Sequence, residues 1–140
     1  MSAAVAALVL ALAGGVSERQ HAPGDGWAAQ EGGTRGGAMA APSHVHTVRN
    51  REELLAALST PAPARIVRVA ASIDMSAGRP FSDTADQARR GAVRIPSNTT
   101  LLGVTPEAGF VNASLQVSGV SQVIVRNLLL RNPCDVEPKW

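Results

Sequence analysis

The stretch that decides the fold begins at Arg94 and reads Arg-Ile-Pro-Ser-Asn-Thr-Thr-Leu-Leu-Gly-Val. After a short interval it continues from Ala113 as Ala-Ser-Leu-Gln-Val-Ser-Gly-Val-Ser-Gln-Val-Ile-Val-Arg-Asn-Leu-Leu-Leu-Arg-Asn-Pro. Its apolar runs are short, rich in β-branched residues and bounded by Asn, Ser and Gly, and no helical period links them. Such runs are typical of β-strands.

Two of these runs, Val123–Val125 and Leu128–Leu130, flank Arg126 and Asn127. We interpret them as two strands that meet at a bend, where Asn127 turns inward and its amide bonds to main-chain groups. A parallel β-helix is built from such corners. The sequence therefore predicts parallel strands over residues 95–132, about 4.8 Å apart in the hydrogen-bonding direction.

Three motifs of this region resemble the pectate lyases: Ile-Pro-Ser-Asn-Thr-Thr at 95–100, Val-Ile-Val-Arg-Asn-Leu at 123–128, and Asn-Pro-Cys-Asp-Val-Glu-Pro-Lys-Trp at 132–140. Upstream, Gly-Trp-Ala-Ala-Gln-Glu-Gly-Gly-Thr-Arg-Gly-Gly at 26–37 is similar to the family's opening. His-Thr-Val at 46–48, followed by Arg-Glu-Glu-Leu at 51–54, is similar to its first strand and helix. The resemblance implies an all-β fold, a right-handed parallel β-helix, of which this chain supplies the N-terminal cap helix and the first coils.

A chain of 140 residues provides few coils, whereas a β-helix needs several to cover its apolar interior at both ends. We therefore expect an incomplete domain in three parts. Residues 1–13 form a secretory signal segment, residues 14–42 a flexible linker that contains a packing segment, and residues 43–140 the N-terminal part of a pectate lyase-like β-helix. The family resemblance implies that Trp27–Gly37 packs against the N-terminal end of the fold.

The signal assignment rests on Ala3–Ala13, an unbroken run of Ala, Val and Leu that is too short to span a bilayer and ends in Ala-Leu-Ala. No Lys or Arg precedes the run, and a fortuitous Ala-rich helix is the alternative. The resulting prediction is a secreted, extracellular protein with no membrane attachment after signal removal.

Local signals place the elements upstream of residue 94. Asn50 is expected to cap a helix and Glu53 to close a capping box. The apolar face of that helix is made by Leu54, Leu55 and Leu58. A strand over Arg65–Val69 is expected to extend through Ile73 and Asp74, and a polar loop to follow, with one helical turn over residues 84–90.

Charge and composition exclude several classes of function. The 13 basic and 11 acidic residues are spread without a block, which argues against nucleic acid or an anionic membrane as partner. A single cysteine, Cys134, rules out an internal disulfide and a zinc cluster of thiolates. His44 and His46 could share one strand face, but two imidazoles without a suitably spaced carboxylate favour a solvated strand edge. We expect no metal site within this chain.

The resemblance also implies a chemistry. Pectate lyases cleave de-esterified polygalacturonate by β-elimination with bound calcium, and an arginine removes the proton at C5. Calcium requires several converging carboxylates, yet the only acids after residue 90 are Glu107, Asp135 and Glu137. In the family the calcium ligands and the base follow the motif at 132–138, so we expect them beyond Trp140.

Two features remain as candidate contacts with the acidic polysaccharide. Asp135 is the candidate substrate-binding residue, with a turn role after Pro133 as the alternative. The adjacent Arg89 and Arg90 could grip uronate carboxylates, with a simply solvated pair as the alternative. The sequence thus predicts the N-terminal part of a secreted, calcium-dependent pectate lyase, monomeric at full length, and no lyase activity for the 140-residue chain alone. The alternative is a non-catalytic β-helix piece that serves as a surface or carbohydrate-adhesion module.

Overall fold

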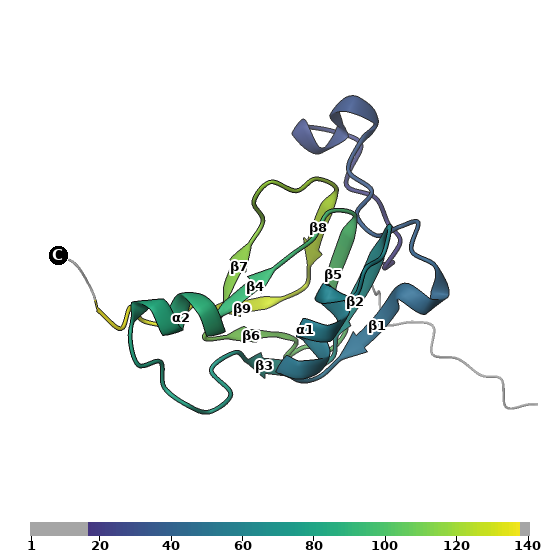
Figure 1. The fold of residues 1–140 in the computed structure, drawn as a ribbon. Helices are drawn as coiled ribbons and strands as arrows, with labels where there is room; N and C mark the ends of the chain where they lie inside the picture. Colours follow the sequence, from purple (N-terminus) through teal and green to yellow (C-terminus); the bar gives the residue numbers. More distant parts are fainter. Residues whose placement is uncertain (1–16, 138–140) are drawn as a thin grey trace, which may run out of the picture.

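The computed structural model describes residues 17–137, and the candidate signal segment at residues 1–13 lies outside them (Figure 1). The described strands are β1 Val45–Val48, β2 Arg65–Val69, β3 Ser72–Asp74, β4 Ala92–Arg94, β5 Thr99–Gly103, β6 Gly109–Val111, β7 Ser114–Gln116, β8 Val123–Arg126 and β9 Leu129–Arg131. The helices are the 3-10 helices η1 Trp27–Gly32 and η2 Pro42–His44 and the α-helices α1 Arg51–Ser59 and α2 Thr84–Arg90. Within the described range no helix has the length and apolar character needed to cross a bilayer.

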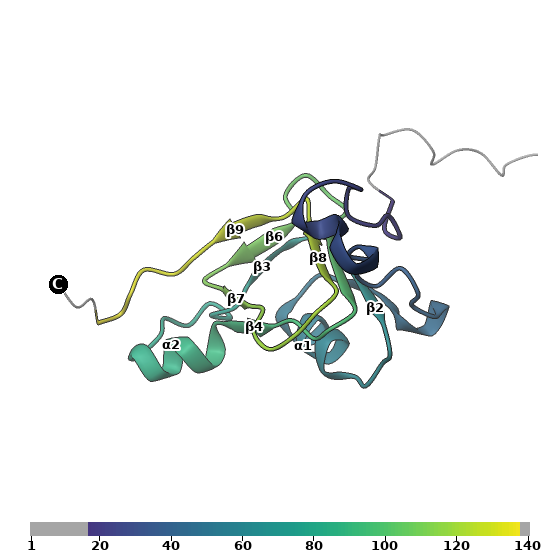
Figure 2. The ribbon, with the colours of Figure 1, turned by 90° about the horizontal axis from the view of Figure 1, so that it is seen from above.

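Every strand pair is parallel. The consecutive strands β1 and β2 pair within one sheet, and from β2 onward each strand lies in a different sheet from the strand before it. The sheet orders are β1-β2-β5-β8, β3-β6-β9 and β4-β7. The chain therefore winds through the sheets in turn, with one coil from β2 to β4, a second from β5 to β7 and a third begun by β8 and β9 (Figures 1 and 2). This is the predicted right-handed parallel β-helix, incomplete at three coils.

One detail of the strand prediction is wrong. Ile73 and Asp74 do not extend β2 but belong to β3, which pairs with β6 in the second sheet. Ala70 and Ala71 separate the two strands, and their small side chains allow the chain to turn from one sheet to the next within two residues. The hydrophobic pattern of the sequence does not reveal this corner, because an apolar run continues through it.

The interior of the coils is a single apolar cluster to which α1 and all three sheets contribute. Its larger members are Val48, Leu54, Leu58, Val67, Val69, Ile73, Met75, Val93, Ile95, Leu101 and Phe110. Burying one such side chain is worth about 1.5–3 kcal/mol. Because Leu54 and Leu58 of α1 join this cluster, the helix covers part of the interior, as expected of a cap helix.

Asn50 caps α1 as predicted, but Glu53 reaches one residue further back than a capping box requires, to the N–H of Arg49 instead of Asn50. The backbone N–H of Glu53 donates to Asn50 Oδ1 at 2.9 Å, and the Glu53 carboxylate accepts from the Arg49 N–H at 2.7 Å. At the other end, the buried Arg65 guanidinium donates to the carbonyls of Ala57 and Leu58 at 3.0 and 2.6 Å. These carbonyls lie in the last turn, where a helix lacks backbone donors, so Arg65 ties the end of α1 to β2.

Three asparagines at the coil corners adopt the left-handed region. Asn98, Asn112 and Asn127 have φ values of 57°, 54° and 53°. Asn98 Nδ2 donates to the Pro63 carbonyl at 3.0 Å, and Asn112 Nδ2 donates to Asp74 Oδ1 at 2.9 Å. Both side chains therefore link one coil to the preceding one.

The prediction that Asn127 is buried is wrong, although the bend itself is present. Its side chain is exposed and makes no hydrogen bond within residues 17–137. The reason lies in the preceding coil, where the stacked corner position is Gly103. The Asn127 carbonyl packs onto this glycine, so backbone contact takes the place of a side-chain amide bond at this corner, and the Asn127 side chain is exposed.

Residues 17–44, which we call the N-terminal strap, lie across the outer face of the first sheet. The Gly37 N–H donates to the buried Thr100 Oγ1 of β5 at 2.8 Å. A Cβ on Gly37 would overlap the Arg65 carbonyl, and one on Gly36 would overlap Thr100 Oγ1. The glycine-rich segment therefore permits backbone contact with the sheet. The packing predicted for Trp27–Gly37 is present only in its second half, and there it is on the outer face of the sheet rather than the N-terminal end of the fold. Trp27–Gly32 form η1, which has no buried residue, and Trp27 is 93% exposed.

Candidate functional site

The longest excursion from the coils runs from β3 to β4 and carries α2. Asp83 caps this helix, because its Oδ1 accepts from the Asp86 N–H at 2.7 Å. Asp86 lies in the first turn, and Arg89 and Arg90 lie in the last, which places each charge at the favourable end of the helix dipole. The helical turn predicted at residues 84–90 is confirmed.

Side-chain hydrogen bonds from Arg89 and Arg90 to Asp86 join the last turn of α2 to its first. Arg90 donates from Nε to Asp86 Oδ1 at 2.9 Å and from Nη2 to Oδ2 at 2.7 Å, and Arg89 donates to Oδ1 at 2.6 Å. The Asp86 side chain is only 8% exposed. The Arg90 guanidinium, with help from the Ser82 N–H, holds the pKa of the Asp86 carboxyl far below its usual range.

Arg90 also anchors the preceding loop. Its guanidinium donates to the carbonyls of Ser76 and Pro80, each at 2.9 Å, and lies over the Phe81 ring at 4.6 Å. With these partners it is a structural residue, not a free cation for a uronate. Arg89 differs, since its side chain is 71% exposed.

The base of the excursion is fixed by Asp74 at the end of β3. Its carboxylate accepts from the Ser76 N–H at 2.9 Å, the Gly78 N–H at 3.2 Å and Asn112 Nδ2 at 2.9 Å. Burial raises the pKa of the Asp74 carboxyl, but the hydrogen bonds from Asn112 and Ser76 outweigh it, so this pKa lies below its ordinary value. The loop that carries α2 is therefore tied to both the first and the second coil.

Residues 132–137, the C-terminal segment, leave β9 and approach α2 (Figures 1 and 2). Gln87 Nε2 donates to the Cys134 carbonyl at 3.1 Å, and the Val136 N–H donates to Gln87 Oε1 at 3.2 Å. Thr84 Oγ1 donates to Glu137 Oε2 at 2.9 Å. The segment forms no strand within residues 17–137, and these hydrogen bonds fasten it to α2.

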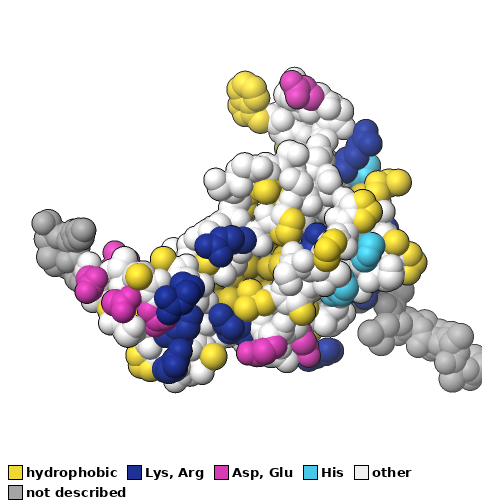
Figure 3. All heavy atoms as spheres, viewed as in Figure 1, with side chains coloured by type: hydrophobic (Ala, Val, Ile, Leu, Met, Phe, Trp, Pro, Cys, Tyr) yellow, Lys and Arg dark blue, Asp and Glu magenta, His cyan; other side chains and the backbone are white. Residues whose placement is uncertain are grey.

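The candidate substrate-binding residue, Asp135, lies in the middle of this contact. Its side chain is exposed, as are those of Cys134 and Glu137. Acidic and basic side chains gather over the α2 region of the surface (Figure 3). The Glu137 carboxylate, by contrast, is engaged with Thr84 of α2. That Asp135 contacts substrate stays a prediction.

Across residues 17–137, no group of three or more His, Cys, Asp and Glu side chains is placed to hold a metal ion. His44 lies in η2 and precedes β1, so it does not share the strand with His46 as expected, and both are half-buried. β1 is nevertheless the edge strand of its sheet. The described residues therefore do not fit a calcium site by themselves.

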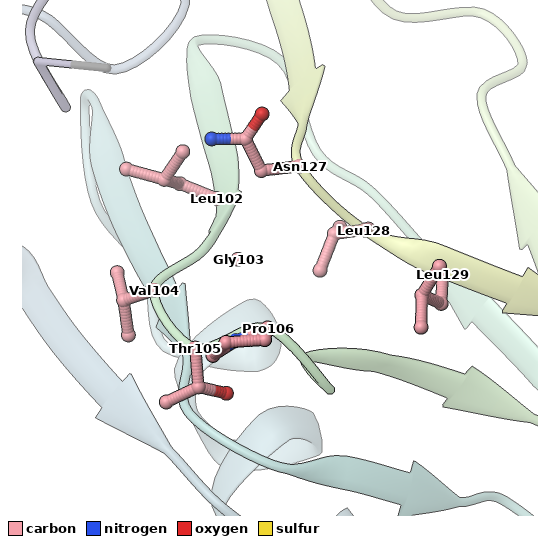
Figure 4. Close-up of a pocket in the computed structure, with 8 residues that line it drawn as sticks. All are labelled: Leu102, Gly103, Val104, Thr105, Pro106, Asn127, Leu128 and Leu129. Atoms are coloured by element: carbon pink, nitrogen blue, oxygen red, sulfur yellow. The ribbon is translucent and has the colours of Figure 1, made fainter. Parts of the chain in front are cut away.

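A pocket of about 580 Å³ opens beside the corners of the second and third coils (Figure 4). It is lined by Leu102, Gly103, Val104, Thr105, Pro106, Asn127, Leu128 and Leu129. The lining is apolar apart from one hydroxyl and one amide. It offers neither a carboxylate nor a base, so we assign no chemistry to it.

The comparisons with known proteins agree with this architecture. The pectate lyase family model matches residues 1–139. Pectate lyase A of Dickeya chrysanthemi is 42% identical over 124 residues, which is 86% of this chain and 32% of the relative. The pectate lyase of Bacillus subtilis is 29% identical over 159 residues, 83% of this chain and 38% of the relative. The chain thus spans about a third of the length of these curated relatives.

Solved structures agree as well. The thermostable pectate lyase PL 47 superposes with a TM-score of 0.76 at 25% identity, over 86% of this chain and 41% of that one. A pectate lyase bound to hexasaccharide superposes with a TM-score of 0.68 at 24% identity, over 81% of this chain and 39% of that one. With a family model over nearly its whole length and the same parallel coils, the chain belongs to the pectate lyase family.

Proposed function

We propose that the chain is the N-terminal part of a secreted pectate lyase that cleaves de-esterified polygalacturonate by calcium-dependent β-elimination. The observation that carries this proposal is the 42% identity to Pectate lyase A over 124 residues, on a matching β-helix. The relative solved with a bound hexasaccharide supports a polysaccharide ligand. Secretion is supported by the apolar run at Ala3–Ala13.

The catalytic groups are proposed to come from further coils of a longer protein. Calcium takes six to eight oxygen ligands, roughly, and residues 17–137 gather no such set. The part that this chain plays is to supply the cap helix, the first coils and the C-terminal segment with Asp135. The carboxylate of Asp135 can accept hydrogen bonds from sugar hydroxyls, but without a bridging cation it would repel a uronate carboxylate.

The test compares two proteins. The nucleotide sequence beyond codon 140 is read, and the 140-residue chain and any longer product are incubated with polygalacturonate and calcium while the ultraviolet absorbance of the unsaturated product is followed. We expect activity from the longer product, abolished by a chelator, and none from the 140-residue chain. Chelator-sensitive turnover by the short chain would contradict the placement of the catalytic groups outside it.

A non-catalytic adhesion module is the second candidate, and the lack of a carboxylate cluster in residues 17–137 is compatible with both candidates. Two observations together would support this candidate over the first. They are a stop codon directly after codon 140, and retention of the chain on immobilised pectate without product formation. A longer reading frame with lyase activity excludes it.

A further inference from the structure

The side chain of Gln87, in α2, forms hydrogen bonds with the backbone on both sides of the candidate residue Asp135. The Gln87 amide donates to the carbonyl of Cys134 and accepts from the N–H of Val136, at 3.1 and 3.2 Å. Asp135 is the only residue between these two partners. A single amide therefore fixes the backbone on both sides of Asp135, while the Asp135 side chain itself stays exposed.

The helix that carries Gln87 is itself held firmly. Arg90 joins α2 to the carbonyls of Ser76 and Pro80, and the Gly91 carbonyl directly after α2 accepts from the Ser114 N–H of β7 at 2.8 Å. Ser76 in turn donates to Asp74. An unbroken series of hydrogen bonds thus runs from the coils through α2 to the peptide groups that flank Asp135.

We infer that Gln87 is a positioning residue: it holds the C-terminal segment on α2 so that Asp135 is presented in one orientation for the polysaccharide. The part that concerns the polysaccharide rests on the proposed function, whereas the positioning rests on the two amide contacts alone. Gln87 acts through the backbone of its partners and does not itself need to touch substrate. Glutamine suits this role, since its amide donates and accepts at once.

The chain offers a probe at the right place. Cys134 is its only cysteine, and the side chain is exposed while the carbonyl makes the contact with Gln87. A nitroxide attached to Cys134 reports nanosecond mobility of the C-terminal segment through its electron paramagnetic resonance line shape.

The test substitution is Gln87→Met, which keeps the length of the side chain and removes both hydrogen bonds. The matched control is Gln30→Met on the exposed side of η1. We expect narrower, more mobile spectra for Gln87→Met and an unchanged spectrum for Gln30→Met. Gln87→Glu keeps the acceptor for the Val136 N–H and loses the donor to the Cys134 carbonyl. Its spectrum should therefore show a mobility between those of wild type and Gln87→Met. If circular dichroism shows that Gln87→Met fails to fold, Gln87→Glu alone decides. Spectra equal to wild type in the folded variants overturn the inference.

A second measurement separates this inference from the proposed function. Labelled chains are titrated with trigalacturonate, with and without calcium. Ordering a loose segment on binding should lower the affinity of Gln87→Met by about two- to tenfold. With calcium present, Asp135→Asn should lower the affinity further without changing mobility. Without calcium it should not lower it, because the substitution removes a charge that repels the uronates. If Gln87→Met loosens the segment but wild type binds no trigalacturonate, the presentation to polysaccharide is overturned and the positioning of the backbone stands.

Discussion

The carbonyl oxygen of Asn127 occupies the space that a side chain on Gly103 would need. A Cβ on Gly103 would overlap this oxygen and would lie 3.0 Å from the Ala108 Cβ. The second and third coils therefore stack in backbone contact at this corner, and glycine is required there because of close approach rather than an unusual φ.

Gly103→Ala should destabilise the fold strongly. Overpacking usually costs about 1–3 kcal/mol, and here the obstruction is a backbone group that cannot rotate away. Urea unfolding followed by circular dichroism measures the loss. Gly24→Ala serves as control, since nothing lies within 4 Å of its Cβ position. Equal losses in the two variants would show that the coils do not stack in this way.

Two substitutions at Asn127 should distinguish the contribution of its backbone conformation to stability from that of side-chain hydrogen bonds. Asn127 has φ 53° and an exposed side chain, so Asn127→Gly should be tolerated. Asn127→Leu should lower the free energy of unfolding by about 1–2 kcal/mol, because a left-handed conformation is costly for leucine. Thermal melts of both variants provide the check. A similar loss in both would instead indicate a side-chain bond in the folded protein.

Thr100→Val should loosen the N-terminal strap. The substitution conserves shape but removes the acceptor of the Gly37 N–H, and a buried unpaired donor costs about 1–3 kcal/mol. Faster tryptic cleavage after Arg35, with a lower denaturation midpoint, is expected. Thr47→Val, at an exposed position of β1, is the matched control. Unchanged cleavage at Arg35 in Thr100→Val would mean that this bond does not hold the strap.

Acid should weaken the loop that carries α2. The pKa of the Asp86 carboxyl is lowered in the folded state, first by the Arg90 hydrogen bond. A depressed carboxyl pKa stabilises the fold above the unfolded pKa of about 3.9 and loses that effect as pH falls through the folded value. The stability difference between wild type and Asp86→Asn should therefore shrink progressively below about pH 4. Denaturation curves between neutral and acidic pH measure it, and a constant difference would contradict the ion pair.

Local chemistry predicted the elements better than the contacts between them. The capping residues Asn50 and Glu53 placed α1, and short branched runs placed the strands of the later coils, because both signals act within a few residues. The backbone contact at Asn127 depended on Gly103, a residue of another coil. Because Gly103 and Asn127 lie in different coils, local sequence signals could not reveal that they pack together.

The candidate site was harder to predict for the same reason. Asp135 was singled out by a family motif, but Gln87 belongs to no motif, and its partners lie 47 and 49 residues away. Asp83 could have located α2 more firmly, since an aspartate before Thr84 with a second acid three residues on marks a helix start. No comparable local signal predicts that a glutamine will form hydrogen bonds with backbone groups far away in the sequence.

The strap has a consequence for the order of folding. It precedes the coils in the chain. Glu18 of the strap pairs with Arg68 of the first coil, but its other partners Thr100, Gln122 and Arg126 belong to the second and third coils. During synthesis these partners emerge long after the strap, and loop closure over such separations is slow. The hydrogen bonds that Arg35 and Gly37 make with Gln122 and Thr100 can therefore form only after β5 and the residues just before β8 have been synthesised. A segment made before the coils is then fully fixed only once the third coil has begun.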